Sequence, residues 1–489
     1  MTNKTRNGRR LASLISAITI LCLAACGQQE NDVSPEATAP APDDGRIRVD
    51  LIVAGDRIVT MNADDAVLED AAVAIQAGLI VAIDDASVID DTYVANERLD
   101  GSNRIVMPGL VNGHSHAAMT LLRGVADDLA LMVWLNNYIF PAEVQFVDEN
   151  FVRIGTELAC WEMIRGGTTT FVDMYYFPDT IAEVVESCGM RAYISATVID
   201  QRSPDAESAA DSIRKGRDFV ARWKNANSRI TPIYGPHANY TLNADQLRET
   251  REAAIEDDVP ISIHMSESPF ELQYSKDTYG TTTIDLMESI GFFDGPTIGA
   301  HVVWPTEAEI PILAERQVGV IHNPTSNMKI ASGVAPVNAM LAAGVRVGLG
   351  TDGAASNNDL DMWEEMRLAA LLQKVELMDP QALPATTVLD MATRGGATAI
   401  GLGESVGRLE VGYKADLIQV DFSDVHHVPT FDVRSHLVYV TDEQDVASVV
   451  VDGKLLMRDR EILTIDTERV AEEARALAAR IQAALEERN

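Results

Sequence analysis

Short apolar runs alternate with amphipathic stretches over the middle of the chain. Eight of these runs have the length and the composition of buried strands: residues 105–112, 168–174, 191–199, 230–235, 260–263, 297–300, 318–321 and 345–349. Strands that alternate with helices form parallel sheets, so eight such units predict an α/β fold of the TIM (β/α)8 barrel type. A doubly wound open sheet is the competing architecture, but no Gly-x-Gly-x-x-Gly motif follows the first run.

Helix boundary signals lie between the apolar runs. Asn243 and Gln246 have the spacing of a capping box, in which each side chain bonds to the backbone of the other residue. Asp148 can cap a further helix, which the pair Gly166-Gly167 would end. These signals predict helices between the strands, as a (β/α)8 barrel requires.

The two ends of the chain show short strands and tight turns instead. Apolar segments flank Ala77-Gly78 near the beginning and Asp452-Gly453 near the end, and each pair predicts a β-hairpin. An amphipathic pattern over residues 467–488 predicts a closing helix. We therefore expect a small composite β-sandwich built from residues 49–107 and 407–489, with the barrel at residues 108–406 between them.

The first residues have the pattern of an export signal. Basic residues between positions 4 and 10 precede an apolar segment, residues 11–25, that is too short to span a bilayer comfortably. The segment ends in Leu-Ala-Ala-Cys, which resembles the bacterial lipoprotein box. We expect residues 1–25 to be removed, Cys26 to be lipidated, and residues 26–48 to form a disordered tether on a membrane-anchored protein that faces the periplasm. An ordinary signal peptide cut near Ala25 is the alternative.

The net charge of −35 over 489 residues makes nucleic acid an improbable partner, because phosphate binding needs a basic surface. Beyond Cys22 and Cys26, only Cys160 and Cys188 remain. Both lie in predicted helices, where cysteines are usually buried thiols, although export would permit a disulfide. The sequence leaves the oligomeric state open.

Polar residues gather at the ends of the predicted strands. In a barrel, these carboxyl-terminal strand ends together form the active site. Six of the nine histidines and one aspartate occupy such positions: His114 and His116 after the first strand, His237 after the fourth, His264 after the fifth, His301 after the sixth, His322 after the seventh and Asp352 after the eighth.

A subset of these residues suits a catalytic metal ion. His114 and His116 lie two residues apart and so face the same side of an extended chain. With His264 and Asp352 they supply four nitrogen and oxygen ligands, which suit Zn²⁺, with Fe²⁺ or Mn²⁺ as alternatives. The end of the fourth strand, residues 234–237, has no lysine that could bridge two metals, so we expect one ion per chain.

Proton transfer needs further groups near the metal. Glu267 follows His264 by three residues and can act as a general acid towards a ring nitrogen. His301 can hold and polarise the attacking water, and Asp352 can take the proton of that water and pass it to the leaving group. This set is typical of a hydrolytic deaminase.

The chain resembles the amidohydrolase superfamily and, within it, the 5-methylthioadenosine/S-adenosylhomocysteine deaminase group. Six motifs in family order carry the resemblance: residues 108–116, 120–124, 235–237, 264–267, 322–327 and 350–358. The resemblance implies a metal-bearing barrel with a composite β-sandwich and a metal on His114, His116, His264 and Asp352. It also implies proton transfer by Glu267 and His301, a purine contact by His237 and ribose contacts by Glu143.

One departure from the family concerns the substrate. Family members often carry an arginine after the third strand, suited to a substrate carboxylate, and Ala196 aligns with it here. Arg202 could replace that arginine. We therefore expect adenosine or 5′-methylthioadenosine as substrate in preference to S-adenosylhomocysteine. A hydrolase of another amino-heterocycle, such as a triazine or a pterin, is the alternative enzyme, and a lipoprotein that binds nucleosides without turnover is the non-enzymatic one.

Overall fold

The computed structural model describes residues 45–486, and Arg46–Asn489 form one compact unit. The predicted signal peptide, Cys26 and nearly all of the predicted tether lie outside the described residues. The first strand, β1 (Ile47–Val59), already includes the last two residues of the predicted tether, 47 and 48. Among the described residues, no helix has both the length and the apolar character that crossing a membrane requires.

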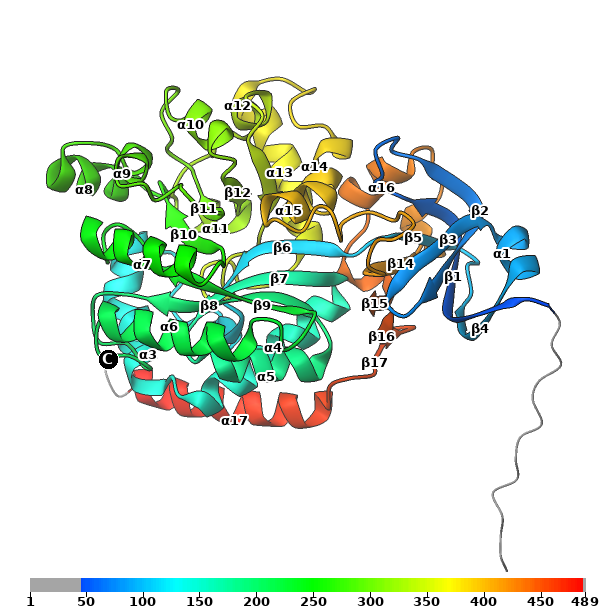
Figure 1. The fold of residues 1–489 in the computed structure, drawn as a ribbon, viewed down its shortest axis with the longest axis horizontal. Helices are drawn as coiled ribbons and strands as arrows, with labels where there is room; N and C mark the ends of the chain where they lie inside the picture. Colours follow the sequence, from blue (N-terminus) through cyan, green and yellow to red (C-terminus); the bar gives the residue numbers. More distant parts are fainter. Residues whose placement is uncertain (1–44, 487–489) are drawn as a thin grey trace, which may run out of the picture. The chain divides into compact units, whose positions relative to one another are not determined.

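Eight parallel strands form the barrel and confirm the predicted α/β class (Figure 1). They run in sequence order around it: β6 (Leu110–Ser115), β7 (Thr168–Tyr175), β8 (Arg191–Val198), β9 (Ile230–Pro236), β10 (Ile261–Met265), β11 (Thr297–His301), β12 (Gly319–His322) and β13 (Arg346–Leu349). Side chains link the last strand to the first: Asn112 Nδ2 donates to Thr351 Oγ1 at 2.7 Å. The Asp352 N–H also donates to the His114 carbonyl at 3.0 Å, which fixes Asp352 beside the end of β6.

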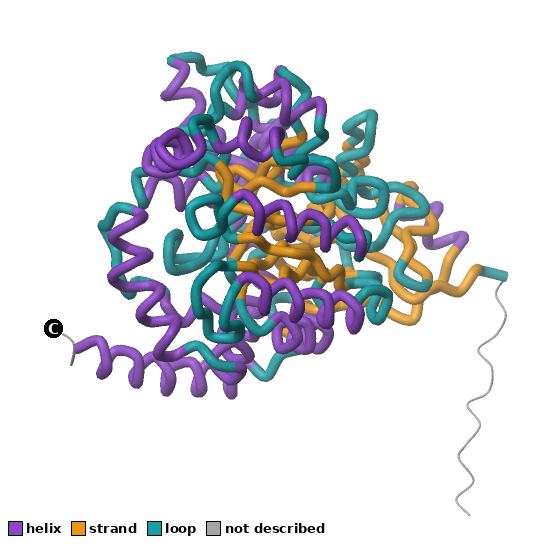
Figure 2. Tube along the Cα trace, turned by 60° about the vertical axis from the view of Figure 1, so that its left-hand side comes forward, coloured by secondary structure: helices purple, strands orange, loops and turns teal. Residues whose placement is uncertain are grey.

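Helices surround the strand core (Figure 2). Asp148 caps α4 (Glu149–Arg165) by accepting the Phe151 N–H, and Asn243 and Gln246 form the predicted capping box of α7 (Ala244–Glu256). The remaining barrel helices are α5 (Pro178–Cys188), α6 (Ala209–Trp223), α8 (Pro269–Tyr279), α9 (Thr283–Ser289), α10 (Ile310–Glu315), α11 (Pro324–Lys329), α12 (Val337–Ala342), α13 (Met362–Leu377), α14 (Ala385–Met391) and α15 (Arg394–Ala399).

The two ends of the chain join in a β domain, as predicted. Its nine strands form one continuous sheet: β1, β2 (Val67–Gln76), β3 (Leu79–Asp85), β4 (Tyr93–Leu99), β5 (Arg104–Pro108), β14 (Leu417–Asp421), β15 (Val446–Val451), β16 (Lys454–Arg458) and β17 (Glu461–Ile462). The N-terminal and C-terminal parts meet where β5 pairs antiparallel with β14, and both predicted hairpins are present. Helices α1 (Ala86–Thr92) and α16 (Val433–Tyr439) belong to these segments, and α17 (Thr467–Glu486) ends the described chain against α4.

The first predicted strand is in fact two strands. Residues up to Pro108 belong to β5 in the β domain, and residues from Leu110 belong to β6 in the barrel. The chain changes sheets at Gly109, whose N–H donates to the Asp416 carbonyl at 3.1 Å. A Cβ at Gly109 would lie 2.1 Å from the Thr169 side chain, so only glycine fits this passage. A continuous apolar run cannot show such a change of sheet.

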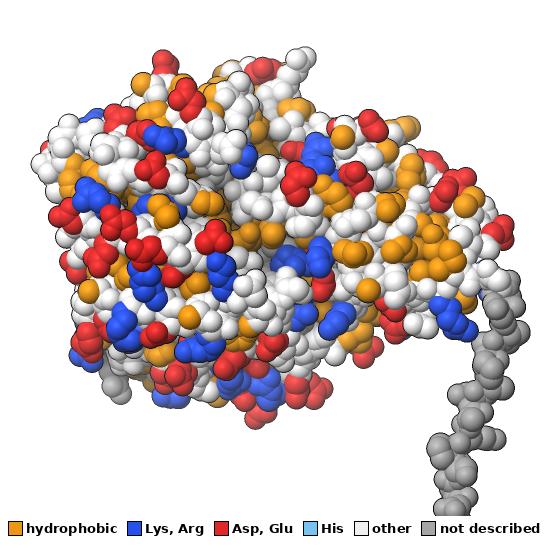
Figure 3. Space-filling model, viewed as in Figure 1, with side chains coloured by type: hydrophobic (Ala, Val, Ile, Leu, Met, Phe, Trp, Pro, Cys, Tyr) orange, Lys and Arg blue, Asp and Glu red, His pale blue; other side chains and the backbone are white. Residues whose placement is uncertain are grey.

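Acidic and basic side chains are interspersed on the face shown in Figure 3. Inside the molecule, Cys160 of α4 and Cys188 of α5 are buried free thiols whose Sγ atoms lie 2.9 Å apart. Close packing of these two helices brings the thiols together.

Candidate active site

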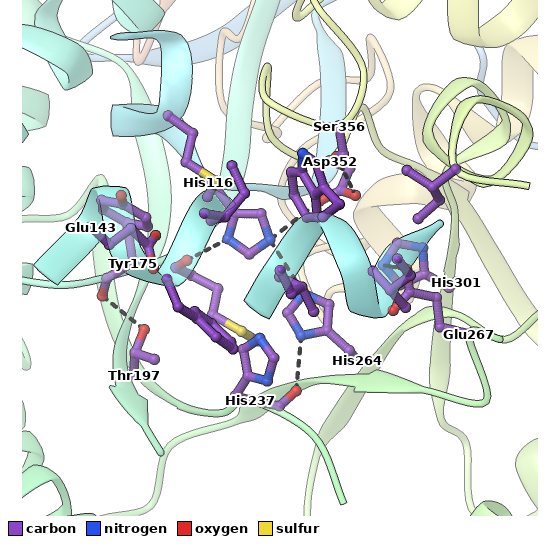
Figure 4. A pocket seen from close by; sticks show the side chains of 18 of the residues that line it. His116, Glu143, Tyr175, Thr197, His237, His264, Glu267, His301, Asp352 and Ser356 are labelled. Atoms are coloured by element: carbon purple, nitrogen blue, oxygen red, sulfur yellow. Dashed lines mark hydrogen bonds and ion pairs between the residues drawn. The ribbon is translucent and has the colours of Figure 1, made fainter. Parts of the chain in front are cut away.

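Histidines and an aspartate from four strand ends converge at one end of the barrel (Figure 4). Ligand atoms of His114, His264, His301 and Asp352 all lie within 4.8 Å of one another. The His116 Nε2 lies 3.2 Å from both the Asp352 Oδ1 and the His264 Nε2. The structure therefore brings together the four residues predicted as metal ligands and places His301 with them.

Hydrogen bonds to the backbone orient two of these rings. The His116 Nδ1 lies 2.5 Å from the Met174 carbonyl, and the His264 Nδ1 lies 2.8 Å from the His237 carbonyl. When each Nδ1–H donates to its carbonyl, each Nε2 lone pair faces the cluster. Histidines that bind metals commonly have this arrangement.

His114 gives the clearest sign that the cluster fits a cation. It is fully buried, and neither of its ring nitrogens has a hydrogen-bond partner among the described residues. Burial lowers the pKa of His114 to about 4 and holds that of His264 well below its usual range, so both rings are neutral, as metal ligands must be.

Asp352 carries the negative charge of the cluster. Although burial raises its pKa, the adjacent His114 and His116 rings, whose Nε2 atoms lie 3.4 Å and 3.2 Å from Oδ1, hold the pKa well below the usual range. The Oδ2 atom accepts hydrogen bonds from the Ser326 hydroxyl at 2.7 Å and the Ser356 hydroxyl at 2.8 Å, which leaves Oδ1 directed at the histidines. The neutral His114 and His264 imidazoles and the ionised carboxylate are donors that fit a divalent metal ion. Asp352 raises the pKa of His116 to about 9, against the effect of burial, so a bound ion would replace a proton on that ring.

His301 lies between the cluster and Glu267. The His301 Nδ1 is 2.9 Å from the Asn327 Oδ1. When Nδ1–H donates to this oxygen, the lone pair of His301 lies on Nε2. This Nε2 faces Glu267, whose Oε1 is 3.9 Å away. His301 and Asp352 both adopt left-handed backbone conformations, with φ of 73° and 63°. Residues other than glycine rarely adopt such conformations, although aspartate and histidine do so more often than most, and those that do are concentrated at functional sites.

Glu267 is held on a loop by another acid. Glu271, in the first turn of α8, accepts the N–H groups of Ser266 at 2.9 Å and of Glu267 at 2.7 Å. Burial raises the pKa of Glu267, and it raises that of Glu271 to about 7. The arrangement keeps a proton available on Glu267 at a higher pH than a solvated glutamate would.

A pocket opens above the cluster and has an apolar wall. The wall comes largely from the connection after β6, in which a 3₁₀ segment η1 (Ala117–Leu122) precedes α2 (Leu131–Trp134), a π-helical turn η2 (Leu135–Ile139) and α3 (Phe140–Phe146). The apolar lining residues are Met119, Leu131, Trp134, Leu135, Ile139, Phe140, Met174 and Ile330.

Two polar side chains predicted to contact substrate also line this pocket. Glu143 projects from α3, is buried, and accepts a hydrogen bond from the Tyr176 hydroxyl at 3.3 Å. Burial raises the pKa of Glu143 to about 7. His237 ends β9, and burial among the other histidines lowers its pKa to about 3, so the ring is neutral. Both residues stand where a substrate above the cluster would meet them.

The described lining residues of the pocket include no lysine or arginine. Ala196 is buried on β8 next to Gly216 of α6, whereas its neighbour Thr197 lines the pocket. Because alternate residues of a strand face opposite sides, position 196 is not where an arginine would reach substrate. The Arg202 side chain is 78% exposed and pairs with Glu207 at 3.5 Å, so it does not replace that arginine.

Several residues that shape the site were not predicted. Ser326, Asn327 and Ser356 lie inside two of the motifs that carry the family resemblance, but their hydrogen bonds to Asp352 and His301 depend on tertiary contacts. The Ser268-x-x-Glu271 spacing signals a helix start and so could have drawn attention to Glu271. For the apolar wall, the sequence carries no comparable signal.

A barrel with a metal-binding cluster at its strand ends and an attached β domain defines a class of hydrolases. The model of the amidohydrolase family matches residues 105–456, and the chain belongs to this family.

Among the relatives, a 5′-deoxyadenosine deaminase of Methanosarcina mazei is 45% identical over 430 residues, which are 88% of this chain and 98% of the relative. A 5-methylthioadenosine/S-adenosylhomocysteine deaminase of Desulforudis audaxviator is 47% identical over 410 residues, 84% of this chain and 94% of the relative. The resemblance inferred from the motifs is thus confirmed.

Solved structures agree with these relatives. An adenosine deaminase from Xanthomonas campestris with bound zinc is 38% identical, has a TM-score of 0.87, and matches over 90% of this chain and 100% of its own. An atrazine chlorohydrolase from Arthrobacter aurescens, at 24% identity and a TM-score of 0.81 over 88% of this chain and 100% of its own, shares the fold. The family and the cluster together establish an aminohydrolase that uses a divalent metal.

Proposed function

We propose that this protein hydrolytically deaminates adenine nucleosides, releasing ammonia and the hypoxanthine nucleoside. One observation carries the proposal: a protonatable Glu267 stands beside a His and Asp cluster beneath a largely apolar pocket. Relatives that share over 40% of their residues with this chain deaminate substrates of this class, which supports the same reaction here.

The resident metal would be held by His114, His116, His264 and Asp352, with His301 adjacent, and we propose Zn²⁺. When bound, a divalent ion lowers the pKa of a coordinated water and so supplies a nucleophile near neutral pH. The alternatives Fe²⁺ and Mn²⁺ use the same ligand types.

The side chains of the protein carry the protons in this reaction. Glu267 donates its proton to a purine ring nitrogen, which makes the adjacent carbon more electrophilic. His301 holds the attacking water through Nε2. Asp352 accepts the proton of that water and passes it to the departing amine, which leaves as ammonia. His237 contacts the purine edge, and Glu143 accepts hydrogen bonds from the ribose hydroxyls.

The pocket lining supports neutral 5′ substituents on the sugar. An amino-acid carboxylate, as in S-adenosylhomocysteine, would find no lysine or arginine among the described lining residues. A 5′-methylthio, 5′-deoxy or hydroxymethyl group would instead meet the apolar wall. We therefore propose adenosine, 5′-methylthioadenosine and 5′-deoxyadenosine as the substrates.

Ammonia release from a panel of compounds tests the proposed reaction. Purified protein should release ammonia from adenosine and its 5′-deoxy and 5′-methylthio analogues, and the absorbance of the base should change to that of hypoxanthine. Release from a pterin or a triazine, with none from the nucleosides, would overturn the proposal in favour of another amino-heterocycle.

A further inference from the structure

The three histidines outside the barrel gather in the connection between β14 and β15. This connection contains a short 3₁₀ segment η3 (Val425–His427), then α16, then a second 3₁₀ segment η4 (Glu443–Asp445). His426 and His427 lie at its beginning and Asp445 at its end. None of these residues takes part in the proposed deaminase reaction.

Side chains from the two ends of the connection meet. The His426 Nε2 lies 3.0 Å from the Asp445 Oδ1, and the His427 Nε2 lies 3.3 Å from the Asp445 Oδ2. Potential ligand atoms of all three residues lie within 4.8 Å of one another. In the described part of the chain, this is the one such group of histidine, cysteine, aspartate or glutamate side chains besides the catalytic cluster.

His427 is buried without a conventional hydrogen-bond partner. Its exposed fraction is 1%, and neither ring nitrogen makes a hydrogen bond with good geometry among the described residues. The ring stacks on Phe422 with 3.9 Å between centroids, so its orientation is fixed. A buried imidazole that lacks a hydrogen bond loses favourable free energy unless something else binds its lone pair.

We propose that His426, His427 and Asp445 form a second site, which binds a divalent transition metal. Two imidazoles and one carboxylate favour Zn²⁺ over Ca²⁺ or Mg²⁺, which prefer oxygen ligands. The His426 side chain is 37% exposed, so the site opens to solvent and water can complete the coordination. The ion would exchange more readily than one enclosed in the barrel.

Metal at this site would tie the two ends of the connection together. The connection is already fastened at its C-terminal end, because the Arg460 Nη1 donates to the Glu443 carbonyl at 2.6 Å and the Arg367 Nη2 donates to the Thr441 carbonyl at 2.7 Å. The bound ion would also fasten the other end of the connection, at η3, to Asp445. It therefore stabilises residues 424–445 without changing the catalytic cluster.

Zn²⁺ titration of the full-length protein tests this proposal. Loosely bound metal is removed by gel filtration, the tightly bound metal is retained, and Zn²⁺ is added in a calorimeter. Wild type should bind one further equivalent. His426→Gln and His427→Gln should weaken that binding at least about tenfold. His436→Gln is the matched control, because the His436 ring is 6.2 Å from that of His427 but lies outside the ligand group.

Hydrogen exchange gives a second measurement. Zn²⁺ should slow amide exchange over residues 424–445 in wild type and in His436→Gln but not in His426→Gln. His426 is exposed, so its replacement should leave folding and nucleoside turnover unchanged even if His427→Gln fails to fold. The proposal fails if wild type binds no further Zn²⁺, or if His426→Gln binds it as wild type does. Nucleoside turnover is assayed separately, so failure of the proposed deaminase activity would be distinguishable.

Discussion

Glu267 and Asp352 are both buried carboxylic acids, yet their surroundings shift their pKa values in opposite directions. Burial raises the pKa of Glu267, and the nearby His301 only partly opposes this shift. At Asp352, the adjacent His114 and His116 rings outweigh burial and keep the group ionised. Two acids with pKa values driven apart are the usual sign of a division between proton donor and proton acceptor.

Replacement of the proposed proton donor should remove catalysis and leave the metal in place. We expect Glu267→Gln to lower kcat by about 10²- to 10⁴-fold, because glutamine has a similar size but cannot deliver a proton. The change should appear in kcat more than in KM, since the proton moves in the transition state. Steady-state kinetics with elemental analysis of the same preparation measures both effects.

Asp352→Asn is the comparison for that variant. It should lose metal as well as rate, because Asp352 contributes the carboxylate of the cluster. A Glu267→Gln enzyme with near wild-type kcat would show that Glu267 only forms part of the pocket wall.

The raised pKa of Glu267 also predicts the shape of the pH profile. Glu267 must be protonated to act as an acid, so kcat should fall as pH rises through the raised pKa of this group. The falling limb should therefore lie at a higher pH than an ordinary glutamate would give. The residual activity of Glu267→Gln should lack this limb, and its persistence in the variant would assign the limb to another residue.

Substrate preference follows from the charge of the pocket lining. We expect kcat/KM for 5′-methylthioadenosine or adenosine to exceed that for S-adenosylhomocysteine, because the missing charge-assisted contact is worth about 1.5–3 kcal/mol. Arg202→Ala should leave the ratio unchanged, since the exposed Arg202 side chain pairs with Glu207. A higher kcat/KM for S-adenosylhomocysteine, lost in Arg202→Ala, would show instead that Arg202 reaches the substrate.

At the scale of single residues, the sequence predicted positions better than interactions. Strand-end spacing was enough to bring His114, His264 and Asp352 together, because parallel strands end at the same face of a barrel. The orientation of each ring depends on partners far away in sequence, such as the Asn327 that fixes His301. No local pattern encodes those partners.

Packing between two elements beside the pocket makes a further prediction. Gly155 of α4 lies against η1, and a Cβ there would be 2.4 Å from the Ala118 carbonyl oxygen. We expect Gly155→Ala to destabilise the fold by about 1–3 kcal/mol, because the backbone of η1 cannot yield as a side chain could. The midpoint of thermal unfolding should fall accordingly.

Gly166→Ala is the matched control for that substitution. Gly166 caps the same helix with φ of −83°, and its nearest neighbour would be 3.6 Å from an added Cβ. The control should stay close to wild type in its unfolding midpoint. Equal stability of both variants would mean that η1 moves aside.

At the scale of elements, the sequence predicted the barrel strands, the hairpins and the last helix, because each has its own periodicity or turn residues. It failed where one pattern serves two elements, as in the apolar run that divides at Gly109 into β5 of the β domain and β6 of the barrel. The π-helical turn η2 was also beyond prediction, since its residues fit an ordinary α-helix equally well.

For the whole molecule, we propose that lipid on Cys26 anchors the protein to a membrane, on the basis of the Leu-Ala-Ala-Cys sequence. Wild type should then sediment with membranes after cell fractionation. Cys26→Ala should be found in the soluble periplasmic fraction with its nucleoside turnover intact. Equal solubility of the two proteins would contradict the lipid anchor.

The pairing of β5 with β14 also dictates an order of assembly. Gln419 of β14 donates from Nε2 to the Ala54 carbonyl at 2.9 Å, across a separation of 365 residues. The β domain, which holds the first strand of the chain, therefore cannot close while the polypeptide is still emerging. Contacts this distant form slowly, so the early strands wait with unpaired edges until synthesis is nearly complete. The β domain is therefore the last part of the protein that can be completed.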